Sequence, residues 1–222
     1  MSVLPASIEL KDIRDKNDLA HIIDEATPLS AASSSALVST ALLLGEFQSI
    51  VDTQAPLSRL LPSNLVLLAP SADAPNVDAQ KFLYDLVIGS EAAAVSMSCS
   101  SILAGQGSES DDTGDIGVWL GEGNYGRGHA GDVLERLGLS QWSGEGKISE
   151  QHLTYRNALP LNGHAKGQEV DKLVKLVDGL SDKYSFRVSS DMTGGIVVFF
   201  LIGRVERGWG GLIGTGTWSD LW

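Results

Sequence analysis

The stretch that decides the fold is residues 196–202, IVVFFLI, the longest uninterrupted apolar run in the chain. Such a run is typical of a strand with both faces covered, because neither side alternates with polar residues. The segments 184–189 and 211–218 precede and follow it as further strands. We therefore expect residues 196–202 to be the central strand of an antiparallel sheet. The run is far shorter than the roughly 20 residues that span a bilayer, so no membrane segment is expected.

Apolar periodicity and turn residues predict the remaining elements. Helices are predicted over residues 17–27, 34–53, 77–89, 132–138 and about 166–180. Further strands are predicted over residues 65–69, 95–99, 116–120 and 149–155, with a turn at 56–62. Gly89 is expected to end the third helix. The expected fold is α+β: an α-β-α sandwich with a mainly antiparallel sheet over residues 90–222, against which a helical segment, residues 1–89, packs.

Composition restricts the function classes. The chain has 222 residues and a formal net charge of −12, which argues against direct nucleic-acid binding because that affinity rests on basic groups. The single cysteine, Cys99, fits a reducing compartment, and its place in the alternating segment 95–99 favours a small core residue over a nucleophile. The opening residues, MSVLPASIEL, do not read as a signal peptide, so we expect a cytoplasmic location.

Acidic residues are concentrated in one stretch. Between Arg59 and Arg127 nine Asp and Glu residues accompany a single base, Lys81. The loop at residues 104–115, AGQGSESDDTGD, is the densest part, and it serves either to bind a basic partner or to keep the chain soluble. As an EF-hand calcium loop it fails, because Leu120 stands where a glutamate is needed. We expect neither a metal nor a cofactor.

Aromatic residues gather at the end of the sequence. The candidate binding residues are four acids of the stretch at residues 104–115 and three of the tryptophans, namely Glu109, Asp111, Asp112, Asp115, Trp209, Trp218 and Trp222. The tryptophans are either anchors at a protein interface or a cover for the edge of the chain's own sheet.

A glycine-rich loop suggests a rival, enzymatic hypothesis. Residues 121–126, GEGNYG, fit the GxGxxG pattern of dinucleotide sites, although Glu122 would lie beside the phosphates and the following helix is short. His129, spaced three residues from Asp132 and six from Glu135, is a candidate general base. The alternative function is therefore a small hydrolase or nucleotide-binding enzyme that uses loop 121–131.

The last third of the chain resembles a known family. The segments VDKLVKLVDGL, YSFRV, IVVFFLIGRV and GWGGLIGTGTW, within residues 165–218, are similar to the closing unit of the nuclease A inhibitor family. There an apolar strand ends in Ile-Gly, here Ile202-Gly203, and a glycine turn leads into the last strand. The resemblance implies an acidic α-β-α sandwich that plugs the active-site cleft of a magnesium-dependent, sugar-non-specific nuclease. We therefore expect a non-enzymatic binding protein whose acidic surface meets a basic protein partner.

Overall fold

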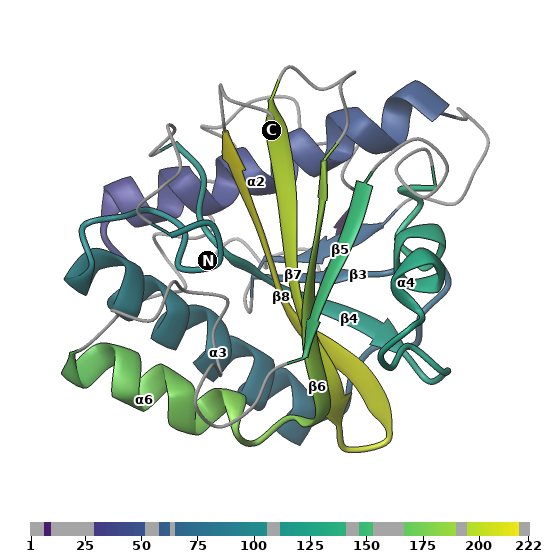
Figure 1. Ribbon diagram of the computed structural model, residues 1–222. Helices are drawn as coiled ribbons and strands as arrows, with labels where there is room; N and C mark the ends of the chain where they lie inside the picture. The colour runs from purple at the N-terminus through teal and green to yellow at the C-terminus, as the bar shows by residue number, and fades with distance from the viewer. Residues whose placement is uncertain are drawn as a thin grey trace, which may run out of the picture.

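The computed structural model describes residues 7–9, 29–51, 58–62, 65–105, 112–140, 147–152, 167–189 and 195–217. In this part of the chain four helices accompany eight strands that form one sheet (Figure 1). The elements are β1 (Ile8–Glu9), α2 (Ala31–Val51), β2 (Arg59–Leu61), β3 (Val66–Leu68), α3 (Val77–Ser96), β4 (Ile116–Gly121), α4 (Ala130–Arg136), β5 (Lys147–His152), α6 (Gln168–Val177), β6 (Ser181–Ser189), β7 (Ile196–Val205) and β8 (Gly208–Thr217). The α+β class is confirmed. The predicted helix at residues 17–27 lies outside the described residues.

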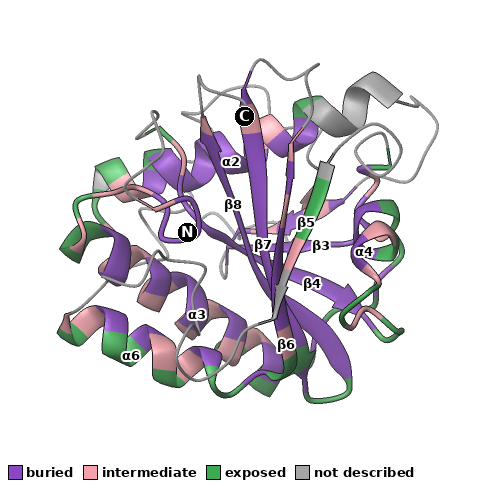
Figure 2. Ribbon diagram, viewed as in Figure 1, coloured by how far each residue is buried: buried purple, intermediate pink, exposed green. Residues whose placement is uncertain are grey.

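The sheet is mostly antiparallel, in the order β1-β2-β3-β4-β8-β7-β6-β5. Among the strands of the described residues, only β3 and β4 pair in parallel. β7 lies between β6 and β8, with Phe200 opposite Phe186 on one side and Ile213 on the other, so the prediction for residues 196–202 is confirmed. Residues 197–203 are all buried (Figure 2), and the rings of Phe186 and Phe200 stack with their centroids 4.3 Å apart. The unbroken apolar run is therefore explained by burial of both faces of the strand.

The parallel pair is joined through α3, which makes β3, α3 and β4 a βαβ unit. The side chain of Asn76 caps α3 by accepting a hydrogen bond from the backbone N–H of Ala79 at 2.8 Å. α3 contacts β3, β4 and β8, and α6 packs along it (Figure 1). At Gly89 a Cβ would lie 2.8 Å from Leu176 Cδ1, so this glycine lets α6 approach α3 closely.

Two predictions at the end of α3 are wrong. The helix continues past Gly89 to Ser96, so Gly89 does not end it, and residues 95–99 are not a strand. In a strand, residues 93 and 95 would lie on the same face and residue 94 on the other. Here Ala93 and Ala94 are both buried whereas Val95 is 64% exposed, so the buried positions follow helical spacing. Cys99 lies just after the helix, half-buried against the core, where its Sγ donates to Ala94 O at 3.6 Å.

The first part of the chain contributes strands to the sheet as well as helices. β1, β2 and β3 form one side of the sheet, and buried Leu60 in β2 pairs with Leu67 in β3 where only a turn was expected. The boundary suggested at residue 89 falls inside α3, and the described residues on both sides of it build the same sheet. α2 agrees with the helix predicted at residues 34–53. Among the described residues no helix combines the length and hydropathy that crossing a membrane requires.

Candidate functional site

The acidic loop, defined here as residues 105–112, connects the end of the α3 region to the start of β4. Glu109 and Asp111 lie outside the described residues. Asp112 is exposed at the end of the loop, where a partner can reach it. Asp115 is only 3% exposed, which corrects its assignment to the binding surface. Its carboxylate faces the interior because it serves as an acceptor for the neighbouring turn.

That turn comprises residues 101–104. Asp115 Oδ1 accepts a hydrogen bond from Ser101 Oγ at 2.6 Å, and Oδ2 accepts from the backbone N–H groups of Ile102 at 2.8 Å and Leu103 at 3.4 Å. Burial raises the pKa of Asp115 to about 7, although these three hydrogen bonds act in the opposite direction. The carboxylate therefore ties the chain just before the acidic loop to the chain just after it.

A second set of contacts fixes the exit of the loop. Thr40 Oγ1, on α2, donates to Gly114 O at 2.6 Å and accepts from the Gly114 N–H at 3.1 Å. Thr113 Oγ1 donates to Thr215 O at 2.8 Å. On β8, a Cβ at Gly214 would overlap Asp115 Oδ1. Hydrogen bonds with α2, β8 and the turn at residues 101–104, most of them buried, therefore hold both ends of the acidic loop.

Trp209 belongs to the interior. It is 5% exposed, its indole N–H donates to Gly123 O at 2.9 Å, and a Cβ at Gly126 would lie 3.2 Å from its ring. The structure therefore places Trp209 against its own glycine-rich loop and not on an exposed interface, which corrects its assignment as a binding residue. Trp218 and Trp222 lie outside the described residues.

The glycine-rich loop, residues 121–131, lacks the setting of a dinucleotide site. That site requires a helix leading from one strand to a parallel neighbour. Here the chain passes from β4 through the seven-residue helix α4 to β5, which lies at the far edge of the sheet. Gly123 serves packing within the loop, since a Cβ there would lie 2.5 Å from the Tyr125 ring.

His129 is held by side chains of its own loop. Its Nδ1 lies 2.6 Å from Asp132 Oδ2, and its Nε2 lies 3.0 Å from Asn124 Nδ2. With the amide nitrogen of Asn124 as the donor, Nε2 is the acceptor, and Nδ1 carries the hydrogen that is donated to Asp132. Glu150 of β5 accepts from the Gly128 N–H at 3.1 Å and braces the same loop. Both ring nitrogens are therefore engaged, and Glu135 is exposed on α4.

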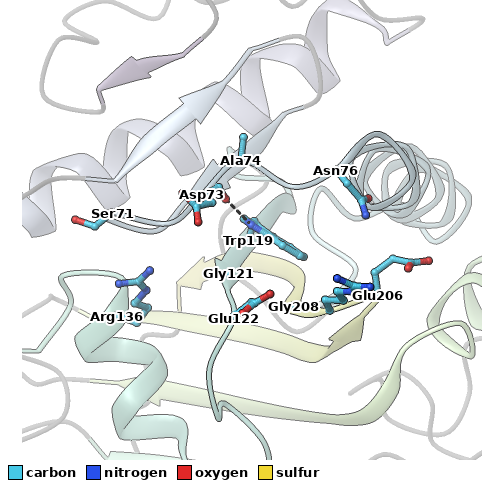
Figure 3. Close-up of a pocket in the computed structure, with 11 residues that line it drawn as sticks. Ser71, Asp73, Ala74, Asn76, Trp119, Gly121, Glu122, Arg136, Glu206 and Gly208 are labelled. Carbon is cyan, nitrogen blue, oxygen red and sulfur yellow. Dashed lines mark hydrogen bonds between the residues drawn. The ribbon is translucent and has the colours of Figure 1, made fainter.

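A groove with a volume of about 320 Å³ lies at the carboxyl ends of β3 and β4. Figure 3 shows the residues that line it. Trp119 lies in it and donates its indole N–H to Asp73 O at 2.9 Å. The charged residues of the lining are Arg136, Arg207, Asp73, Glu122 and Glu206. Crevices at this edge of an α/β sheet commonly bind ligands. Sequence reasoning missed the groove because its walls come from four separate segments, at residues 71–76, 119–122, 136 and 206–208.

The comparisons with known proteins add no assignment: no family model, curated protein or solved structure matches the chain. Among the described residues, no cluster of three or more His, Cys, Asp or Glu side chains is arranged to hold a metal ion.

Proposed function

We propose that this protein is a non-enzymatic binding protein that presents its acidic loop to a basic surface of a partner protein. The observation that carries the proposal is that hydrogen bonds hold the acidic loop at both of its ends. Buried hydrogen bonds from Asp115 and Thr40, and a part-buried one from Thr113, fix both of its ends. A loop on a rigid base loses less conformational entropy on binding, which is why binding loops are commonly carried by rigid scaffolds.

The charge around the loop supports the same proposal. Asp112 is exposed, and the loop carries two further carboxylates. The one base of the acidic stretch, Lys81, forms an ion pair with Asp85 on α3. The acidic loop concentrates negative charge in a short stretch of sequence, and its field attracts a basic partner.

The finer form of the proposal is inhibition of a magnesium-dependent, sugar-non-specific nuclease, acting in the cytoplasm. It is motivated by the resemblance of residues 165–218 to the nuclease A inhibitor family. In this proposal the acidic loop enters the cleft that otherwise holds the phosphate chain of the substrate. Trp218 and Trp222 remain predicted contacts to the same partner.

The enzymatic alternative has less support from the geometry. A general base needs a ring nitrogen that can reach the substrate proton. In His129 one nitrogen donates to Asp132 and the other accepts from Asn124. The histidine is thus arranged as a structural group that shapes loop 121–131.

Inhibition of such a nuclease tests the proposal. The loop variant carries Glu109→Gln, Asp111→Asn and Asp112→Asn, which remove three charges and leave Asp115 in place. The control variant carries Asp78→Asn, Glu135→Gln and Asp171→Asn, which remove three charges from exposed helix positions. We expect wild type and the control variant to inhibit the nuclease similarly, and the loop variant to inhibit it at least about tenfold less.

Two outcomes contradict the proposal in different ways. Equal inhibition by the two variants would show that only overall charge matters, and the acidic loop would lose its role. No inhibition by wild type would exclude the nuclease and leave the coarser proposal to a search for other basic partners. Thermal unfolding of each variant checks that the fold is retained.

A further inference from the structure

A second hollow lies near the tip of the β7–β8 hairpin, beside Trp209, with a volume of about 380 Å³. We call it the Trp209 pocket. Its lining includes Asn124, Arg127, Asp182, Lys183, Arg204 and Trp209. Three cations and one carboxylate therefore surround a pocket in a protein whose formal net charge is −12. Cations concentrated in this way favour an anionic ligand.

The cations are positioned by the fold. The guanidinium carbon of Arg204 lies 6.0 Å from the centroid of the Trp209 ring, within the range of a cation–π contact. Within the described part of the chain, neither Arg204 nor Arg127 forms an ion pair with a carboxylate. Lys183 Nζ lies 3.0 Å from Asp178 Oδ1 and 3.5 Å from Leu180 O. These two contacts hold the ammonium in place and leave its third N–H for another acceptor.

Asn124 adds a neutral donor. One N–H of its amide points to His129 Nε2 at 3.0 Å, and the second N–H is left for another acceptor. His129 is in turn held by Asp132 at 2.6 Å. This chain of hydrogen bonds orients the amide at the pocket wall, and it gives the His129–Asp132 pair a positioning role.

We propose that the Trp209 pocket binds the phosphate group of a small molecule. A phosphate dianion has three terminal oxygens that can accept from two guanidinium groups and an amide together, whereas a carboxylate has two oxygens and one charge. A volume of about 380 Å³ lies at the lower end of small-molecule sites, which limits the ligand to about the size of a mononucleotide. The groove of Figure 3 is a poorer anion site, because three carboxylates outnumber its two cations.

The proposal is independent of the acidic loop, and titration of the full chain followed by NMR tests it. Inorganic phosphate and glycerol 3-phosphate are the probes, with glycerol and acetate as controls. The indole N–H signal of Trp209, assigned by comparison with Trp209→Phe, reports on the pocket wall. We expect saturable shifts with both phosphates at a Kd near or below about 1 mM, and acetate binding at least about tenfold more weakly. Tighter binding of the ester than of inorganic phosphate identifies an organic phosphate as the ligand, and the reverse order identifies free phosphate.

Variants locate the site. Arg204→Gln and Arg127→Gln should each weaken phosphate binding about tenfold, because each removes a charge-assisted hydrogen-bond donor. Lys175→Gln removes one charge from an exposed position on α6 and should change the Kd less than about twofold. Shifts that do not saturate, acetate that binds as well as phosphate, or equal losses in all three variants would overturn the proposal. If Arg204→Gln lowers the melting temperature strongly, the Kd that Arg127→Gln shows for phosphate tests the proposal instead.

Discussion

The two ends of β4 differ in how the charged residues around them are placed, buried at one end and exposed at the other. Before its first residue, Ile116, a buried carboxylate and buried hydroxyl groups fix the base of the acidic loop. After its last residue, Gly121, a glycine-rich loop and a hairpin tip carry exposed cations around Trp209. The comparison teaches that charge density along a sequence does not locate a site. The carboxylate nearest the acidic loop is structural, while dispersed bases gather into a pocket.

The largest effect is expected from Gly214→Ala, at the acidic end. The new Cβ would overlap Asp115 Oδ1 and lie 2.8 Å from Ser101 Oγ, so the methyl group must displace a buried hydrogen bond. Overpacking and the lost bond together should lower the free energy of unfolding by about 2–5 kcal/mol. Chemical denaturation measures this loss. The loss should shrink in an Asp115→Ala background, and a cost that is identical in both backgrounds would show that the carboxylate is not what the methyl group meets.

The pH dependence of stability probes the same end. The pKa of Asp115 is raised from 3.8 to about 7 by burial, so the folded state holds a proton that the unfolded state releases between these values. The contribution of this group to stability is full below about pH 4, falls as the pH rises to about 7, and is constant above that. The loss amounts to as much as about 4 kcal/mol, at about 1.4 kcal/mol per pH unit.

Asp115→Asn isolates this contribution, because its amide resembles the protonated carboxyl group. We expect the variant to gain stability relative to wild type as the pH rises from 4 to 7. Denaturation measured at several pH values on both proteins gives the difference. Parallel stability curves would contradict the assignment of a raised pKa to Asp115.

A smaller effect on the free energy of unfolding is expected from Thr40, which holds the chain just after the acidic loop. Thr40→Val keeps the shape of the side chain and removes the hydroxyl that bonds both the carbonyl and the N–H of Gly114. We expect a loss of about 1–3 kcal/mol in the free energy of unfolding, because a buried carbonyl is left without this donor. Thr40→Ser keeps the hydroxyl and should recover most of the loss. If Ser and Val cost the same, packing and not the hydrogen bond holds this end.

The smallest effect is expected from Gly131→Ala on α4, near the opposite end. A Cβ there meets no atom within 4 Å, so the substitution adds helix propensity without a clash. The melting temperature should rise, in line with a gain of about 0.5–1 kcal/mol. A loss comparable to that of Gly214→Ala would remove the contrast between the two ends.

The sequence predicts strands β6, β7 and β8 well, because the residue patterns that indicate them are local. The apolar run of β7 and the alternation of Tyr184, Phe186 and Val188 in β6 are visible in any short window. Gly89 is different: the reason for its glycine is the side chain of Leu176 on another helix. Read alone, it indicates a helix end, and the alternating serines that follow then imitate a strand.

The candidate sites were less predictable for a related reason. Burial decides whether an acid is a binding group or a structural one, and Asp115 differs from Asp112 only in what the fold packs around it. The clustering of tryptophans likewise does not distinguish an interface anchor from a buried ring such as that of Trp209. The cations of the Trp209 pocket come from three segments, residues 124–127, 182–183 and 204–209, which only the sheet order brings together.

The most direct test of the proposed binding function is a map of backbone and indole N–H shifts when the labelled protein is titrated with a sugar-non-specific nuclease. The acidic loop is predicted to be the contact, so the shifts should concentrate at its described ends, Gly105 and Asp112, and at Thr113. The Trp209 indole signal should not move, because it lies at the other end of β4. Shifts centred on Trp209 and Arg204, with none around the acidic loop, would contradict the proposal.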